Sequence, residues 1–193
     1  MPKENEITPD LLYKNFISTK LLENRIIMIF GEINQKLAQD VSEKLLILAN
    51  DSDEKIKIFI NSQGGHVEAG DTIHDMIRFL EPLVHIIGTG WVASAGALIY
   101  SAPPVKQRYC LPNTRFMLHQ PSGGFGGMAS DISIEAREIV KMRERLNRIF
   151  AERTGQPLDR IAEDTDRNFW MTPKEAIDYG LAGKVVKKLA NIK

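Results

Sequence analysis

Ser94 is the residue of this sequence whose surroundings best suit a nucleophile. It stands in the run Gly90-Trp91-Val92-Ala93-Ser94-Ala95-Gly96, which is rich in very small side chains, just after the apolar segment 84–87. Small neighbours let the backbone turn sharply out of a strand and let a substrate approach, and residues 95–100 are predicted to form a buried helix. The spacing is not the Gly-x-Ser-x-Gly of the α/β-hydrolases, because Val92 stands two residues before the serine. A plainer alternative is a close-packed joint whose serine only caps the helix.

A serine hydroxyl is a weak nucleophile unless an imidazole takes its proton, so the four histidines are the candidate bases. His119 is preferred, because it ends a strand just before Gln120-Pro121, where an α/β sheet presents functional side chains. His66 follows a glycine pair and could also reach a site. His74 is predicted on the polar face of its helix, in solvent, and His85, inside an apolar strand, is predicted to be a hydrogen-bonded core residue.

The candidate donors to an oxyanion are backbone N–H groups. Gly64 and Gly65 follow a predicted strand, and glycines allow N–H groups to face a substrate carbonyl. The N–H of Ala95 could supply a second donor. The alternative for the glycine pair is an ordinary turn.

The elements that would position these residues alternate between strands and helices. Strands are predicted over 25–30, 55–61 and 84–87, and helices over 35–49 and around 73–80. Such alternation, joined by right-handed crossovers, predicts an α/β fold with a largely parallel sheet. A short helix is expected to open at Thr8-Pro9, and residues 1–7 are expected to be loose.

The order of elements changes after the serine. Two short strands are predicted around 109–111 and 115–119, and the glycine-rich stretch 122–127 is expected to form a strand that leads into a long helix from about 130 to 153. Together these last two would protrude from the core. Thr172 opens a capping box with Pro at the first helical position, and Gly180 closes that helix before a strand at 185–186.

The composition narrows the class of protein. With 193 residues, 43% of them hydrophobic and 26% charged, the chain 1–193 is the size of one domain with a substantial core. Basic and acidic residues number 25 each, so charge favours neither nucleic acid nor a membrane surface. One cysteine, Cys110, no signal pattern, and no apolar run near the roughly 20 residues of a membrane span predict a cytoplasmic protein.

Six motifs, in order, carry a resemblance that covers about 21–186. They are Ile60-Asn61-Ser62-Gln63-Gly64-Gly65, Gly90-Trp91-Val92-Ala93-Ser94-Ala95, Cys110-Leu111-Pro112-Asn113, Met117-Leu118-His119-Gln120-Pro121-Ser122, Asp131-Ile132 and Asp164-Thr165-Asp166-Arg167. In this combination the sequence resembles the proteolytic subunits of Clp protease, which are serine peptidases with the ClpP/crotonase fold. The resemblance implies a head over 21–121 and 155–193, a protruding strand-helix handle over 122–154, and an N-terminal axial arm over 1–20.

For the site, the resemblance implies that Ser94 is the nucleophile, His119 the base, and Gly65 and Ala95 the oxyanion donors. The family has an Asp as the third triad residue, directly after the motif that is Asp164-Thr165-Asp166-Arg167 here, and Asn168 occupies that position in this chain. A weakened triad Ser94-His119-Asn168 is therefore expected, with no metal or cofactor.

For substrate and partner, the resemblance implies that the segment Gly123-Gly124-Phe125 pairs with extended, unfolded polypeptide. A Clp-type AAA+ ATPase, which consumes the ATP, would dock on Phe59, Phe79 and Tyr109. Lys57 departs from the family's pattern, because an aromatic residue of that docking surface is expected there.

For assembly, the resemblance implies two seven-membered rings of this chain, or rings mixed with a second subunit of the family. The handle would interlock the rings, and Asp166 with Arg167 would link them beside the site. Two further departures concern Gln63, which replaces the usual Pro before the glycine pair, and residues 1–20, which lack the family's apolar-then-basic axial segment.

Two other functions remain open at this point. Asn168 favours a largely structural ring subunit whose serine rarely acts beside an active second subunit. A crotonase-like acyl-CoA enzyme would share the fold and the backbone oxyanion donors, but the pair Ser94 and His119 disfavours it, because that class uses no serine nucleophile.

Overall fold

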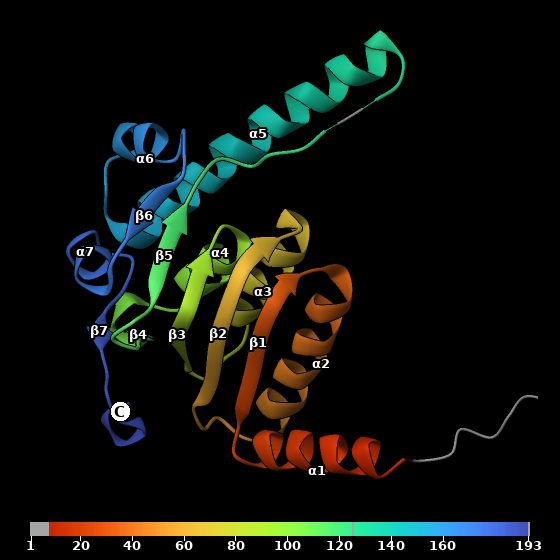
Figure 1. Ribbon diagram of the computed structural model, residues 1–193, viewed down its shortest axis with the longest axis vertical. Helices are drawn as coiled ribbons and strands as arrows, with labels where there is room; N and C mark the ends of the chain where they lie inside the picture. The colour runs from red at the N-terminus through yellow and green to blue at the C-terminus, as the bar shows by residue number, and fades with distance from the viewer. Residues whose placement is uncertain (1–7, 125, 193) are drawn as a thin grey trace, which may run out of the picture.

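The computed structural model of the protein describes residues 8–124 and 126–192 (Figure 1). The helices are α1 (Pro9–Glu23), α2 (Gln35–Asp51), α3 (Val67–Phe79), α4 (Ala95–Ser101), α5 (Ala129–Thr154), α6 (Leu158–Asp164) and α7 (Pro173–Asp178). The strands are β1 (Ile26–Ile33), β2 (Ile56–Gly65), β3 (Val84–Ala93), β4 (Arg108–Cys110), β5 (Arg115–Leu118), β6 (Phe169–Met171) and β7 (Lys184–Val185). The predictions made for residues 1–7 and for Phe125 lie outside the described residues.

One sheet organises the protein, in the order β1-β2-β3-β4-β7, and every neighbouring pair along this path is parallel. The far edge of β3 is shared between two strands: residues 86–88 pair with β4, and residues 91–93 pair with β5. β6 extends the second branch antiparallel to β5. The predicted α/β class with a largely parallel sheet is confirmed.

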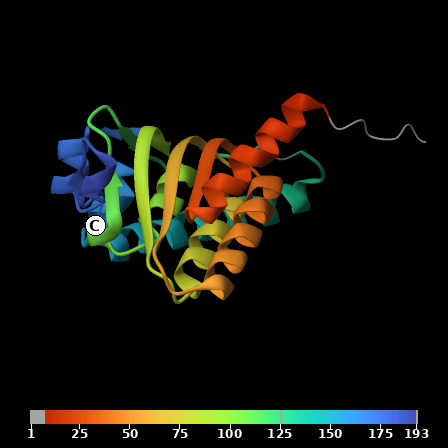
Figure 2. The ribbon, with the colours of Figure 1, turned by 90° about the horizontal axis from the view of Figure 1, so that it is seen from below.

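The core lies between this sheet and the helices that cover one side of it. Figure 2 shows α2 and α3 together on the same side of the strands. Alternate residues of β1 and β2 are buried against the apolar stripes of these helices, as the two periodicities require. The cluster includes Ile27, Ile29, Val41, Leu45, Ile58, Ile60, Ile73 and Ile77. Full burial of one such side chain contributes about 1.5–3 kcal/mol, so strands and helices stabilise one another.

Three strands are longer than the sequence predicts. β3 continues to Ala93. β1 continues through Gly31 to Ile33, and β2 continues through polar residues to Gly65. The register between them shifts at Phe30/Glu32, and Gly31 adopts a φ of +83° there. Because both strands keep partners beyond the shift, pairing holds the glycine-rich ends in the sheet, and the interpretation of Gly64-Gly65 as an ordinary turn is wrong.

The region after β5 differs most from the prediction. Residues 122–124 belong to no strand, and the chain runs outward to the tip at which α5 begins (Figure 1). The predicted strand over 122–127 is therefore not formed by residues 122–124 of the single chain, because a strand needs a partner for its backbone groups. No sequence prediction covers α6 or β6, and α1 is longer than expected.

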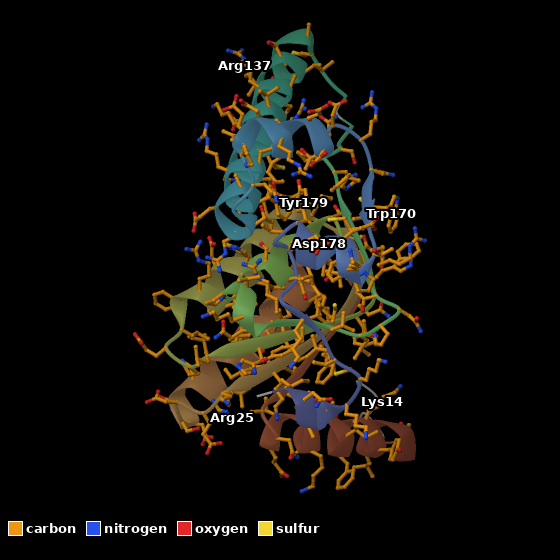
Figure 3. The ribbon with its side chains drawn as sticks, turned by 90° about the vertical axis from the view of Figure 1, so that its left-hand side faces the viewer. Lys14, Arg25, Arg137, Trp170, Asp178 and Tyr179 are labelled. Carbon is orange, nitrogen blue, oxygen red and sulfur yellow. The ribbon has the colours of Figure 1, made fainter. Side chains whose placement is uncertain are left out.

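Helix α5 is confirmed within one residue of its predicted ends. Its buried residues are Leu146, Asn147 and Phe150, all in its C-terminal half, whereas residues 129–138 are exposed. Figure 3 shows Arg137 towards the outer end of this helix, beyond the rest of the protein. Gly155 ends the helix in the left-handed conformation, with φ of +76°.

Strand β4 carries two fully buried polar side chains. Burial raises the pKa of the Cys110 thiol to about 11, and its Sγ lies 3.8 Å from the carbonyl oxygen of Lys184. Arg108 is 1% exposed, and its guanidinium donates to the carbonyl oxygens of Pro103 at 2.7 Å and Arg153 at 2.9 Å. Burial, with the nearby charge of Arg153, lowers the pKa of Arg108 to about 10. Arg108 therefore ties the loop after α4 to the end of α5.

We expect Arg108→Met to lower the free energy of unfolding by roughly 2–4 kcal/mol, because the apolar replacement fills the space but leaves buried carbonyl oxygens without donors. Chemical denaturation measures it. Arg148→Met is the control, since Arg148 is exposed and pairs with Glu144 one turn away, and its effect should stay within about 0.5 kcal/mol. Equal small effects for both variants would contradict a stabilising role for Arg108.

Candidate active site

Ser94 occupies a strained backbone conformation where β3 ends and α4 begins. Its φ is 55° and its ψ is −124°, and Ser94 and Arg25 are the non-glycine residues with positive φ in the described chain. Such conformations cost about 1–3 kcal/mol and persist only where the surroundings enforce them. Here Gly64 packs directly against Ser94, because a Cβ at Gly64 would lie 2.5 Å from the Ser94 Cβ. The run of small residues therefore allows the turn, as predicted.

The Ser94 side chain does not cap the helix. No side-chain capping bond is formed by Ser94, and the N–H groups of Ala97 and Leu98 donate to its carbonyl oxygen instead. The capping alternative is therefore wrong, and the hydroxyl is available for another partner.

His119 is that partner. Its Nε2 lies 2.8 Å from the Ser94 Oγ. The contact follows from the parallel pairing of β3 with β5, in which Ala93 is opposite Met117 and the Ser94 N–H donates to the Met117 carbonyl at 3.0 Å. Because parallel strands end at the same edge of a sheet, both side chains emerge together.

Asn168 lies just before β6, and its side-chain interaction with His119 raises the pKa of that histidine. Since Nε2 faces Ser94, the nitrogen left for Asn168 is Nδ1. Burial has the larger effect and lowers the pKa of His119, so the interaction with Asn168 opposes it only in part. A neutral imidazole, able to accept a proton, is thus favoured near pH 7.

The glycine pair lies beside the serine. The Gly64 N–H is already engaged with the Ser62 Oγ at 3.0 Å, so Gly65 is the candidate donor of the two. Gly65 has no room for a side chain, because a Cβ would collide with the backbone of Ile33. Ala95 is the first residue of α4, directly after Ser94.

A small, mostly apolar pocket opens at Ser94 and His119. Pro121 lines it after β5, and the helices α3, α4 and α5 add four side chains that no sequence prediction assigns to the site: Val67, Leu98, Leu146 and Phe150. The four-residue spacing of Leu146 and Phe150 predicts a shared helix face, but no sequence signal says which surface that face meets.

The other histidines lie away from this contact. The His66 Nδ1 accepts the Ala69 N–H at 3.4 Å as the N-cap of α3. His74 is 1% exposed, so its predicted place in solvent is wrong; α3 is flanked by α2 and α4, and its buried face is wider than its apolar stripe. His85 is buried as predicted, but its Nδ1 has no hydrogen-bond partner among residues 8–124 and 126–192, so the expected hydrogen bonding is incomplete there.

Asp166 and Arg167 lie close to the site on its outer side. The Gln120 Nε2 donates to the Asp166 carbonyl oxygen at 2.7 Å, and the Arg143 Nη2 of α5 lies 3.1 Å from Asp166 Oδ1. The Arg167 side chain is 87% exposed. Asp166 is thus linked within the chain to both α5 and the residue after His119.

The structure brings together two of the three residues expected to dock a partner. Phe59 packs against the small cluster that Tyr109 forms with Ile87 and Val186, on the sheet face away from the main core. Phe79, at the end of α3, is 78% exposed and lies outside that cluster. Gly123 and Gly124 are exposed.

The described residues contain neither a candidate membrane span nor a candidate metal site. In residues 8–124 and 126–192, no helix combines the length and apolar character needed to cross a membrane. Within the same ranges, no group of three or more His, Cys, Asp or Glu side chains could hold a metal ion.

A strained serine at a strand end, hydrogen bonded to a histidine on an α/β sheet, is the arrangement of a serine hydrolase. Comparison with known proteins narrows this class. The family model described as Clp protease matches residues 12–189, and the chain belongs to this family.

Similar proteins and solved structures support membership of the same family. The ATP-dependent Clp protease proteolytic subunit 3 of Rhizobium etli is 58% identical, over 98% of each chain. The subunit of the same name from Rhizobium meliloti is 63% identical over 89% of this chain and 88% of its own. Among solved structures, ClpP1 of Listeria monocytogenes matches with a TM-score of 0.83 at 53% identity, and an Asn-to-Asp variant of it with 0.86 at 54%; each covers 92% of this chain and 99% of its own.

We expect the reaction of the protein with a fluorophosphonate probe to show an acid limb whose midpoint lies below about pH 6.5, because burial lowers the pKa of His119 and protonation removes the base. Asn168→Asp should shift this acid limb upward by about 1 pH unit or more, since a carboxylate stabilises the imidazolium. Labelling rates between pH 4.5 and 8 measure both, with Ser94→Ala as the unlabelled control. A limb above pH 6.5 in the unchanged protein would contradict the assignment.

Proposed function

We propose that the protein is a serine endopeptidase of the Clp type, in which Ser94 attacks the peptide carbonyl and His119 accepts its proton. The observation that carries this is the 2.8 Å contact between His119 Nε2 and Ser94 Oγ at a strained turn. The family membership supports the same reaction class.

The reaction proceeds in two halves. As Ser94 Oγ bonds to the carbonyl carbon, its proton passes to His119 Nε2, and the N–H groups of Gly65 and Ala95 stabilise the negative oxygen. His119 then gives the proton to the leaving amine, and the C–N bond breaks to leave an acyl-enzyme on Ser94. Water, deprotonated by His119, releases the acid and restores the serine.

Asn168 is the third member of this triad. An amide oxygen can accept the Nδ1–H of His119 and so fix the tautomer in which Nε2 is free to take the serine proton. It carries no charge, however, and cannot stabilise the imidazolium as a carboxylate does. Low intrinsic turnover is therefore part of the proposal.

We also propose the assembly that the sequence analysis predicts. Two seven-membered rings, of this chain alone or mixed with a second subunit of the family, would interlock through the handle 122–154, with Asp166 and Arg167 linking the rings. The exposed outer half of α5 and the exposed Arg167 side chain support this, because both are free to meet another chain. The cytoplasmic location stays a prediction.

Substrate and partner complete the proposal. An unfolded polypeptide would lie along the segment Gly123-Gly124-Phe125, and a Clp-type AAA+ ATPase would dock on Phe59, Phe79 and Tyr109. Residues 123–124, which belong to no strand among the described residues, and the apolar cluster that joins Phe59 to Tyr109 support these assignments. ATP would be used by the partner only.

A second candidate is a largely structural ring subunit, which the neutral amide of Asn168 favours. Labelling by a fluorophosphonate distinguishes the two: stoichiometric reaction of Ser94 indicates an enzyme, and no reaction in any assembly indicates a structural subunit. The acyl-CoA alternative is disfavoured by the Ser94 and His119 contact.

We expect Ser94→Ala to lower peptidase turnover by about 10³-fold or more, because no other group can form the acyl-enzyme. Assembly and thermal stability should change little, since the side chain loses one oxygen only. Hydrolysis of a short fluorogenic peptide and the sedimentation of the variant measure this. Wild-type turnover by Ser94→Ala would refute the nucleophile.

We expect Asn168→Asp to raise turnover by at least about 10-fold, with the roughly 10⁴-fold effect of the reverse change in serine proteases as the upper bound. The carboxylate would keep the orientation of His119 and add the missing charge. Turnover is compared at matched oligomeric state near neutral pH. Asn113→Asp is the control, because it adds the same charge in an exposed turn at the other end of β5. No gain, or a loss, would mean that Asn168 does not limit the reaction.

A further inference from the structure

We propose that Ser62 is a positioning residue that holds the glycine pair in its oxyanion-binding geometry, an inference that rests on the proposed function. Ser62 is in β2, three residues before Gly65, and is 1% exposed. It is not a catalytic residue, because it acts through Gly64 and Gly65.

The Ser62 hydroxyl joins two backbone groups at once. It donates to the Gly31 carbonyl oxygen of β1 at 2.5 Å and accepts the Gly64 N–H at 3.0 Å. A hydroxyl can donate once and accept as well, so both bonds coexist. Ser62 therefore ties the backbone before the oxyanion donor to a fixed point on the neighbouring strand.

The Gly31 carbonyl lies at an irregularity of the sheet. Gly31 lies where the register of β1 shifts against β2, with φ of +83°, and on the other side the register of β2 shifts against β3 between Ile60 and Ser62. Regular parallel pairing would commit a strand carbonyl to a neighbouring N–H. At this shift the Ser62 side chain donates a hydrogen bond to the Gly31 carbonyl oxygen.

The hydrogen bonds of Ser62 to Gly31 and Gly64 also connect to the nucleophile, through Gly64. Gly64 packs against Ser94, and beyond the pair the His66 N–H donates to the Ile33 carbonyl oxygen at 2.8 Å. Gly96 of α4 packs against Ser62 itself, since a Cβ there would lie 3.2 Å from the Ser62 Cβ. The hydroxyl thus sets the position of Gly64 relative to both Ser94 and α4.

A group that aligns an oxyanion donor affects the transition state more than the bound peptide, because the negative oxygen exists only after attack. Removal of the Ser62 hydroxyl should leave peptide binding intact and slow the chemical step. If the Ser62 hydroxyl were merely structural, its removal would change the stability of the protein but would not slow the chemical step relative to peptide binding.

The first test is Ser62→Ala in the full chain at matched oligomeric state. We expect kcat/KM for a short fluorogenic peptide to fall roughly 10- to 100-fold. The affinity of a peptide boronate, whose tetrahedral adduct on Ser94 fills the oxyanion position, should fall by a similar factor. The affinity of the corresponding free-acid product peptide should not change by more than about 2-fold. Ser101→Ala is the control, because Ser101 is also fully buried and also donates to one carbonyl, that of Leu98.

The second test perturbs the hydrogen bond between Ser62 and Gly31 from the Gly31 side, and it remains informative if Ser62→Ala does not fold. Gly31→Ala introduces strain at a positive φ without a clash, since nothing lies within 4 Å of the added Cβ. Gly155→Ala is the matched control, with φ of +76° and equally open space at the end of α5. Only Gly31→Ala should lower kcat/KM and boronate affinity together. In the double variant with Ser62→Ala the two losses should not multiply, because both act on one contact.

The outcomes separate this inference from the function on which it rests. If Ser94→Ala abolishes turnover while Ser62→Ala and Gly31→Ala keep wild-type kcat/KM and boronate affinity, the positioning role is refuted and the peptidase stands. If both variants lose product-peptide affinity as much as boronate affinity, Ser62 is structural. If Ser94→Ala itself keeps full turnover, the proposed function fails first.

Discussion

The pairing of β5 with the second half of β3 is the constraint on which the site depends. β3 pairs with β4 over residues 86–88 and with β5 over 91–93, so the far edge of one strand serves two branches. The bond from the Ser94 N–H to the Met117 carbonyl fixes the register at the point where both strands end. A slip of one residue would turn His119 to the opposite face. The contact between the two side chains is thus a property of the sheet rather than of a flexible loop.

The strained turn at Ser94 is maintained by packing around it. All residues of α4 are buried, and Gly64 lies against the serine, so the turn cannot relax without opening the core. Beside this turn, the neutral side chain of Asn168 interacts with His119 and opposes the effect of burial on its pKa. In the triad proposed above, Asn168 would orient His119 without adding a charge.

The sequence predicts a reactive residue where that residue stands at the end of a predicted strand. It does not predict a residue whose role depends on which groups it contacts in the folded chain. Ser94 and His119 were found because apolar runs precede both. His74 was misplaced because helical periodicity does not show that neighbouring helices also cover α3. Residues 122–124 pair with no strand in the part of the chain that the structure describes, and β6 is three residues long and depends on β5. Ser62 joins a carbonyl of one strand to an N–H of its own, and no spacing in the sequence encodes such a bond.

The buried thiol of Cys110 has a practical consequence. It is the one cysteine of the chain, and with a pKa of about 11 it holds almost no thiolate at neutral pH. Maleimide dyes and spin labels react through the thiolate, so the native chain should give little background. A single cysteine introduced on the exposed outer half of α5 would then carry a fluorophore alone. Energy transfer or dipolar distances between such labels could follow encounters between subunits in solution without first removing a native residue.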